Sequence, residues 1–246
     1  MLVAAGAIYG LAATEAFGFS TLRIQGTTII VDAEIERRLA LTGGQNLFQI
    51  ESDPLEARIR EIPAVASVDI SIGLPDTVIV DVAERRPTLV WQVGERSFLV
   101  DAEGRLFAER GDPIPPAVAD LPIVADERIA SHALQVAGTV DPVDLDVASR
   151  LASLTPAQLG SGAAGLAIGV TDENGFVVRS TPKGWTAVFG FYGLSLRTPD
   201  LIDDQVQLLA HLLAGREATV ATAILADARD GTVILKTPAP SAAPAP

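Results

Sequence analysis

Two short runs of alternating apolar and polar residues, joined by a turn, constrain this sequence more than any other feature. The first run spans residues 66–72 and the second spans residues 78–82, with Gly, Leu, Pro and Asp at 73–76 between them. Alternation of period two is typical of a strand with one buried face, and Gly, Pro and Asp favour a turn. The apolar face is predicted to hold Ala66, Val68, Ile70, Ile72, Val78, Val80 and Val82. The sequence therefore predicts an amphipathic β-hairpin that needs other elements to cover its apolar face.

The residues before the hairpin supply that cover as two short amphipathic helices. One is predicted to begin at Asp53-Pro54, an N-cap followed by proline at the first helical position. The other is predicted over residues 32–41, with Asp32 as its cap, and a strand over residues 21–25 precedes it. The apolar stripes of the two helices are Ile35 and Leu39 in the earlier one, and Leu55, Ile59 and Ile62 in the later one. The order strand, helix, helix, strand, strand fits a small domain.

This order of elements, with the residues that occupy it, resembles the POTRA domain of the FtsQ/DivIB family of bacterial cell-division septum proteins. The matching residues are Ile24-Gln25-Gly26, Gly44-Gln45-Asn46-Leu47-Phe48, Ile50, Leu55, Ile59, Ile62-Pro63-Ala64-Val65, Val68, Leu74-Pro75-Asp76-Thr77 and Val82-Ala83-Glu84-Arg85-Arg86-Pro87. The resemblance implies a β-α-α-β-β POTRA domain over residues 20–87. Glu84 and Arg85 are interpreted as a structural junction between this domain and the next.

The composition excludes several classes of function. The net charge is -13 and there are only two lysines, Lys183 and Lys236, so the chain is expected to repel nucleic acid and anionic lipid surfaces. Cysteine is absent, which excludes disulfides, thiolate nucleophiles and cysteine-based metal sites.

Residues 2–19 are apolar and small except for Thr14 and Glu15. Hydropathy alone is compatible with a membrane anchor, a secretory signal peptide or a buried helix of a globular domain. The resemblance implies the first, because FtsQ-like proteins carry a single anchor directly before the POTRA domain. It also implies a single-pass protein of the cell membrane whose bulk lies outside the cytoplasm.

The second half of the chain has a mixed pattern. Strands are predicted over residues 88–93, 97–101, 166–171, 176–180, 185–191, 220–228 and 232–236, and helices over residues 141–154 and 200–214. Phe98-Leu99-Val100-Asp101, Gly104, Leu106-Phe107, Leu121-Pro122-Ile123-Val124 and Asp227-Ala228-Arg229 resemble motifs of the FtsQ-type β domain. The expected fold class is α+β: an anchor over residues 1–19, the POTRA domain, and a β-rich domain over residues 88–237. That domain is expected to have a mostly antiparallel sheet with packed helices, followed by a disordered Pro/Ala tail over residues 238–246.

A search for catalytic or ligand-binding motifs finds little. Residues 160–165 satisfy G-x-G-x-x-G, but a helix-like stretch precedes them and a strand follows, the reverse of a dinucleotide site. His132 and His211 lie far apart in the sequence, and no serine lies in G-x-S-x-G. Asp141, Asp144 and Asp146 lack the pattern of a calcium loop, and the Asp203-Asp204 pair is better explained by the helix dipole than by acid–base chemistry. We therefore expect no enzyme activity, no cofactor, no metal and no small-molecule substrate.

Binding of another protein is what remains, and the last strand is the candidate surface. An unpaired sheet edge can accept a strand from another chain. The family resemblance implies that partners of the FtsB/DivIC and FtsL type bind in this way. The partner-binding residues carried over from it are Arg229, Thr232, Val233, Ile234, Leu235 and Lys236. Arg229 has two interpretations that the sequence leaves equal: it holds a partner carboxylate, or it pairs internally with Asp227 or Asp230.

The expected function is that of a non-enzymatic scaffold that recruits divisome proteins to the septum for peptidoglycan synthesis. The alternative is a POTRA-containing chaperone module for the assembly of outer-membrane or secreted proteins. Such proteins usually carry a C-terminal barrel of long alternating strands, and no such run follows Pro87.

Overall fold

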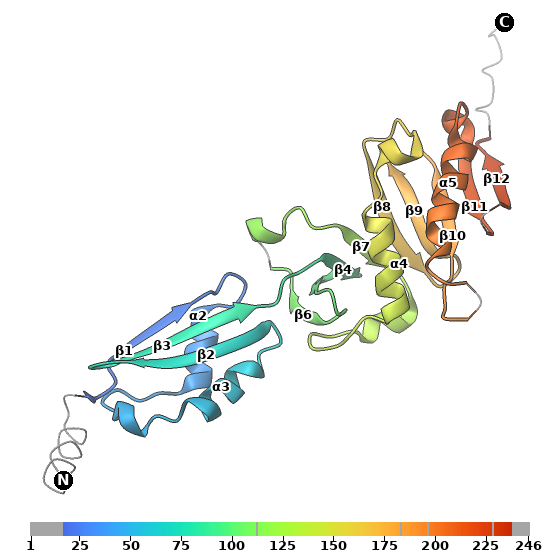
Figure 1. Cartoon of the computed structure of the whole chain (residues 1–246). Helices are drawn as coiled ribbons and strands as arrows, with labels where there is room; N and C mark the ends of the chain where they lie inside the picture. Colours follow the sequence, from blue (N-terminus) through green and yellow to red (C-terminus); the bar gives the residue numbers. More distant parts are fainter. Residues whose placement is uncertain (1–16, 112, 183, 196, 228, 238–246) are drawn as a thin grey trace, which may run out of the picture. The chain divides into compact units, whose positions relative to one another are not determined.

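The computed structural model describes residues 17–237, except residues 112, 183, 196 and 228 (Figure 1). The predicted membrane anchor and the predicted Pro/Ala tail therefore lie outside the described residues, apart from residues 17–19 of the anchor and residue 237. The chain divides into two compact units between Arg86 and Pro87. Both units mix helices with sheets, so the predicted α+β class is confirmed for the described part of the chain.

The first unit has the predicted order of elements. They are β1 (Thr21–Gln25), α2 (Asp32–Leu39), the short 3-10 helix η2 (Leu47–Gln49), α3 (Ser52–Arg60), β2 (Val65–Gly73) and β3 (Thr77–Glu84). The three strands form one sheet in the order β1-β3-β2, with β1 parallel and β2 antiparallel to the central β3. One face of this sheet packs on α2 and α3 (Figure 1).

The register of the β2–β3 hairpin follows from the alternation, with one exception. Ile70 lies opposite Val80 and Val68 opposite Val82, and all four side chains are buried on the helix-covered face. A β-bulge between Val65 and Ser67 shifts the pattern at the start of β2. Val65 is therefore buried and Ala66 is exposed, so the predicted placement of Ala66 on the apolar face is wrong.

The predicted helix caps are also corrected. Helix α2 begins at Asp32 itself, behind Val31, and α3 begins at Ser52, behind Glu51; neither helix has a side-chain cap. Asp32 instead accepts a hydrogen bond from the Thr27 hydroxyl at 2.9 Å. Burial of Ile35, Leu39, Leu55 and Ile59 fixes these helices, because eight or nine residues are too few for an isolated helix.

The second unit is built on a nine-stranded sheet. Its strands are β4 (Leu89–Val93), β5 (Arg96–Val100), β6 (Leu106–Glu109), β7 (Ile123–Asp126), β8 (Gly165–Thr171), β9 (Gly175–Thr181), β10 (Thr186–Gly190), β11 (Val220–Leu225) and β12 (Gly231–Leu235). Their order is β12-β11-β10-β9-β8-β7-β4-β5-β6. The pairs β10–β11, β4–β7 and β7–β8 are parallel and the other five are antiparallel, which agrees with the predicted, mostly antiparallel sheet.

Helices α4 (Pro142–Ala152) and α5 (Leu201–Leu213) lie on one face of this sheet (Figure 1). Asp141 caps α4 as predicted, because its carboxylate accepts the N–H groups of Val143 and Asp144. The buried residues of both helices, among them Val147, Leu151, Ile202 and Leu209, pack into one core with the facing strands. The opposite face of the sheet carries no α-helix among the described residues.

Within residues 17–237, and leaving aside the four undescribed positions, none of the helices is long and apolar enough to cross a membrane.

Candidate partner-binding edge

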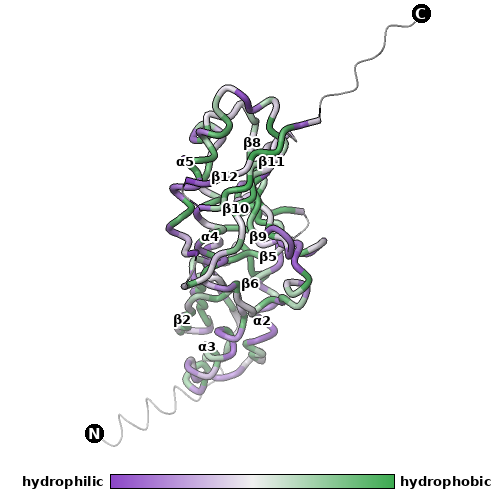
Figure 2. The backbone as a smooth tube through the Cα atoms, turned by 90° about the vertical axis from the view of Figure 1, so that its right-hand side faces the viewer, coloured by the Kyte–Doolittle hydropathy of each residue, from purple (hydrophilic) through white to green (hydrophobic). Residues whose placement is uncertain are grey.

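Strand β12 is the last strand in the sequence and lies at one end of the nine-stranded sheet. Its inner edge pairs with β11, and among the described residues no strand pairs with its outer edge (Figure 1). The end of this strand is coloured as hydrophobic in Figure 2. The opposite end of the sheet differs. There the start of β6 is covered, because Leu106 donates its N–H to the carbonyl of Gly138 and accepts the N–H of Ala137. Among the described residues, β12 is therefore the edge strand with no such cover.

The pairing with β11 fixes which backbone groups of β12 point outward. The N–H of Lys236 donates to the Thr219 carbonyl, and the Asp230 carbonyl accepts the N–H of Ala226. In an antiparallel pair, successive residues point their N–H and C=O groups alternately toward and away from the neighbouring strand. Thr232 and Ile234 therefore bond to β11, whereas Gly231, Val233 and Leu235 direct their backbone groups outward.

The side chains of β12 divide between the two faces of the sheet. Val233 lies opposite Ala223 and packs on the core, and Thr232 and Ile234 lie on the other face. Ile234 is 50% exposed and Leu235 is 59% exposed, high values for aliphatic side chains in a strand. Thr232 and Lys236 are exposed as well. All six residues predicted from the sequence thus lie along this edge or in the turn before it.

The turn before β12 is organised by Asp227. Its carboxylate accepts the backbone N–H groups of Arg229 at 2.7 Å and Asp230 at 2.8 Å. These bonds lower the pKa of Asp227. Asp227 thus bonds the Arg229 backbone, whereas the exposed Arg229 guanidinium forms no ion pair with any described carboxylate.

Two side chains that the sequence analysis did not single out hold the β11 end of this hairpin. Gln205, fully buried on α5, donates to the carbonyls of Phe189 and Leu225 and accepts the hydroxyl of Tyr192. Arg197 donates to the same Leu225 carbonyl. Burial, first of all, raises the pKa of Tyr192, so the phenol stays neutral. The sequence does contain a signal for Gln205, because it is the one amide side chain within the apolar stripe of α5.

The other end of the hairpin lies beside the glycine-rich loop. Lys236 donates its ammonium group to the Ala218 carbonyl at 3.0 Å, and Glu217 accepts the N–H of Gly162 at 3.0 Å. The Glu217 carboxylate also accepts hydrogen bonds from the hydroxyl of Ser161 and the indole N–H of Trp185. The bond from Ser161 comes first among the causes that lower the pKa of Glu217. The loop that satisfies G-x-G-x-x-G therefore binds the chain's own carboxylate, and a 3-10 helix (Pro156–Leu159) precedes it, as the sequence indicated.

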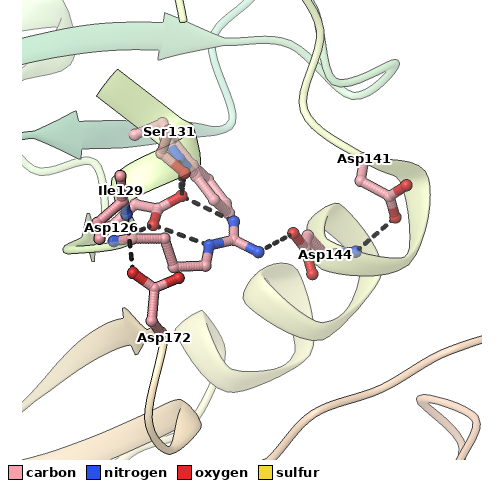
Figure 3. Close-up of polar contacts among 8 residues, drawn as sticks. Asp126, Ile129, Ser131, Asp141, Asp144 and Asp172 are labelled. Carbon is pink, nitrogen blue, oxygen red and sulfur yellow. Dashed lines mark hydrogen bonds and ion pairs between the residues drawn. The ribbon is translucent and has the colours of Figure 1, made fainter. Parts of the chain in front are cut away.

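The acidic residues of α4 serve structural purposes. Asp141 caps the helix, Asp146 pairs with Arg150 at 2.8 Å, and Asp144 pairs with Arg128 at 2.7 Å (Figure 3). Arg128 also donates to the carboxylate of Asp126, which is buried. The same carboxylate accepts hydrogen bonds from the hydroxyl of Ser131 and the indole N–H of Trp91. No group of three or more His, Asp or Glu in the described part of the chain could hold a metal ion. His211 is exposed on α5, and His132 lies in a 3-10 helix (Ile129–Ala133).

Comparison with known proteins gives a domain family for the first unit and similar proteins for a longer part of the chain. A family model described as "POTRA domain, FtsQ-type" matches residues 17–85. Cell division protein FtsQ of Streptomyces venezuelae is 34% identical over 109 residues, which cover 44% of this chain and 40% of that protein. The Mycobacteroides abscessus protein of the same name is 28% identical over 141 residues, 56% of this chain and 44% of that protein.

The chain thus matches about two fifths of the length of these two relatives. A match to Cell division protein FtsQ of Chloroflexus aurantiacus extends further, at 24% identity over 208 residues, 85% of this chain and 71% of that protein. The first unit thus carries a POTRA domain of the FtsQ type, and the chain as a whole is similar to proteins named Cell division protein FtsQ, with matches that extend into its second unit.

Proposed function

We propose that this protein is a non-enzymatic, membrane-anchored scaffold of bacterial cell division that recruits other division proteins for septal peptidoglycan synthesis. Its relatives are named cell division proteins, which supports the general role. The proposed mechanism is strand addition to β12. The observation that carries it is the contrast between the two ends of the large sheet: residues 137–139 cover the start of β6, and nothing in the described part of the chain covers β12.

An added strand would bond to the outward N–H and C=O groups of Gly231, Val233 and Leu235. Such bonds supply affinity without sequence preference, and side chains at alternate positions supply specificity. Ile234 and Leu235 offer exposed apolar surface on opposite faces of the edge. A partner strand with apolar residues at neighbouring positions would bury both.

Charge favours a partner segment with carboxylates near its ends. The chain as a whole has a net charge of -13, and Arg229 offers an exposed cation at one end of β12, in the turn that also holds Asp227 and Asp230. Lys236, at the other end, donates to the Ala218 carbonyl near Glu217. The Arg229 guanidinium is exposed and can hold a carboxylate bidentately. These features fit segments of proteins of the FtsB/DivIC and FtsL type, the partners that the family resemblance implies.

Anchoring at the membrane would strengthen this capture. If residues 2–19 span the cell membrane, the bulk of the protein and the partner ectodomains meet on its outer surface at the division site. Confinement to one surface raises the effective concentration of each partner, so weak edge pairing is sufficient for assembly.

The test compares two variants of one exposed residue. Leu235→Pro removes the side chain and an outward N–H, whereas Leu235→Ala removes only the side chain. Binding of an FtsB/DivIC-type ectodomain to immobilised full-length protein should be weaker for Leu235→Pro than for Leu235→Ala by about three- to tenfold, the effect of one net hydrogen bond of about 0.5–1.5 kcal/mol. Equal affinities of the two folded variants would exclude strand addition at this edge.

A further inference from the structure

One end of the first unit gathers exposed apolar side chains around the point at which the chain enters it. This end, here called the N-terminal pole, consists of residues 17–20, 40–51 and 73–76. Phe48 is 57% exposed and Leu74 is 60% exposed. Both are large apolar side chains that the described part of the protein leaves largely exposed to solvent.

Backbone hydrogen bonds hold the three segments of the pole together. The N–H of Phe19 donates to the Gln45 carbonyl at 2.8 Å, and the Phe19 carbonyl accepts the N–H of Gly44 at 2.8 Å. The N–H of Ser20 donates to the Asp76 carbonyl at 2.9 Å. The rings of Phe17 and Phe48 lie edge to face with centroids 5.3 Å apart. The loop that carries Phe48 and the turn that carries Leu74 therefore flank the entering chain directly.

The sequence leaves no spacer between this pole and the apolar stretch of residues 2–19. Only Ser20 separates Phe19 from the first residue of β1, Thr21. A residue of extended chain spans about 3.3 Å. If the part of this stretch that precedes Phe17 inserts into a bilayer, the loops bonded to Phe19 and Ser20 are brought to the membrane surface, and so are Phe48 and Leu74.

The charge of the N-terminal pole indicates whether it would contact lipid through anionic headgroups or through apolar insertion. The segments of the N-terminal pole contain no Lys or Arg, and their charged residues are Glu51 and Asp76. The neighbouring Arg58 donates to the carbonyl of Leu39 and is a cation that borders these segments. Contact with lipid therefore comes mainly from the apolar side chains, which bind at the boundary between headgroups and acyl chains.

We propose that the N-terminal pole is a lipid-contacting surface, with Phe48 and Leu74 inserted into the interface of the bilayer that holds the apolar stretch before Phe17. This inference rests on the proposed membrane attachment and not on strand addition at β12. Two side chains are too few to bind a bilayer alone, but a unit tethered through Phe19 meets the surface at high effective concentration.

The absence of cysteine allows a direct test on the full-length protein, because single cysteines can be labelled with a nitroxide. The variants are Phe48→Cys, Leu74→Cys and the control Val31→Cys. Val31 is 68% exposed but lies in the loop after β1, at the opposite end of the same unit. The labelled proteins are reconstituted into phosphatidylcholine vesicles, and collisions with oxygen and with a water-soluble nickel chelate are measured by power saturation.

At positions 48 and 74 we expect the ratio of oxygen to chelate collisions to exceed that at position 31 by at least threefold. The ratio should be unchanged when a quarter of the lipid is phosphatidylglycerol. Chelate access equal to that at position 31 would overturn the proposal, and so would protection from both reagents, which indicates cover by the protein itself. Failure of the protein to float with the vesicles would instead refute the membrane attachment on which the inference rests.

Discussion

The carboxylate of Asp126 and the guanidinium of Arg128 lie 2.7 Å apart at the end of β7, and Asp126 is only 1% exposed. Arg128 also pairs with Asp144 of α4 at 2.7 Å, so this ion pair ties the helix to the sheet (Figure 3). Loss of the Asp126 charge leaves Arg128 with Asp144 alone and deprives the buried donors of Ser131 and Trp91 of their anionic acceptor.

Asp126→Asn should therefore lower the free energy of unfolding of the second unit by about 3 kcal/mol. Asp146→Asn is the matched control, because it removes the same charge from an exposed pair with Arg150 and should cost less than about 1 kcal/mol. Urea unfolding followed by circular dichroism measures both values. Similar losses for the two variants would show that the Asp126 network contributes no more than a surface pair.

The same residue should make stability depend on pH. Burial raises the pKa of Asp126, but the hydrogen bonds from Arg128 and Ser131 outweigh it and hold the pKa below the ordinary value. A carboxyl group with a lowered pKa stabilises the fold above its unfolded pKa of about 3.9, and this contribution is lost as the pH falls through the folded pKa.

The free energy of unfolding should therefore fall more steeply below about pH 4 in the wild type than in Asp126→Asn. Asp76, Glu217 and Asp227, whose pKa values are also lowered, remain in both proteins, so the difference between the curves reports on the Asp126 network. Urea titrations at half-unit steps from pH 2 to 7 provide the curves. Parallel curves would refute the role assigned to Asp126.

The elements that could be predicted from the sequence are those set by local patterns. Alternation at residues 66–72 and 78–82 gave the β2–β3 pair, and Asn174-Gly175 marked the turn between β8 and β9. The errors are local as well. The bulge after Val65 reverses one residue of the alternation, and the N-caps of α2 and α3 lie one and two residues before the predicted aspartates.

The order of the nine strands could not be read from the sequence. The parallel pairs β4–β7 and β10–β11 join strands that are far apart in the chain, and no short-range pattern specifies them. The cover over β6 likewise depends on a backbone contact between Leu106 and residues 137–138. The placement of β12 at an edge was an expectation from the family resemblance and from its position as the last strand.

Because the backbone N–H groups of β12 point alternately toward β11 and outward, proline substitutions at neighbouring positions should differ in their cost to stability. Ile234→Pro removes an N–H that points toward β11 and should destabilise the second unit by about 2 kcal/mol, because a ladder bond is lost and its acceptor is left unpaired. Leu235→Pro removes an outward N–H and should cost less than about 1 kcal/mol, as expected of proline on an edge strand. Thermal unfolding of both variants tests this. A larger loss of stability for Leu235→Pro would show that the N–H of Leu235, and not that of Ile234, points toward β11.

Glu84 should contribute strongly to the stability of the first unit. Its carboxylate accepts the N–H groups of Thr28, Ile29 and Ile30 at 2.7–3.0 Å, and so fixes the loop before α2. These bonds lie within the first unit, whereas the sequence suggested a junction between domains. Glu84→Gln should cost about 1–3 kcal/mol, because charge-assisted bonds are lost and an amide N–H₂ faces backbone donors.

The control for Glu84 is Glu61→Gln, which removes a carboxylate that pairs with Arg38 at 2.8 Å and is 68% exposed. Its cost should stay below about 1 kcal/mol. Hydrogen exchange of the amides of Thr28, Ile29 and Ile30 provides a second readout. Their protection should fall in Glu84→Gln alone, and unchanged protection would contradict the assignment.

Gly26 should tolerate no side chain. Its φ is +85°, and a Cβ atom there would lie 2.0 Å from the carbonyl oxygen of Val82. Gly26→Ala must therefore shift the end of β1 away from β3 and should cost at least about 2 kcal/mol, from left-handed strain and the steric clash together.

Gly43→Ala is the matched control, because nothing lies within 4 Å of its Cβ position and its φ is not positive. That variant should be neutral or stabilising by up to about 1 kcal/mol, since alanine reduces the entropy of the unfolded chain. Thermal unfolding of the two proteins separates these effects, and equal melting temperatures would show that the loop after β1 adapts without strain.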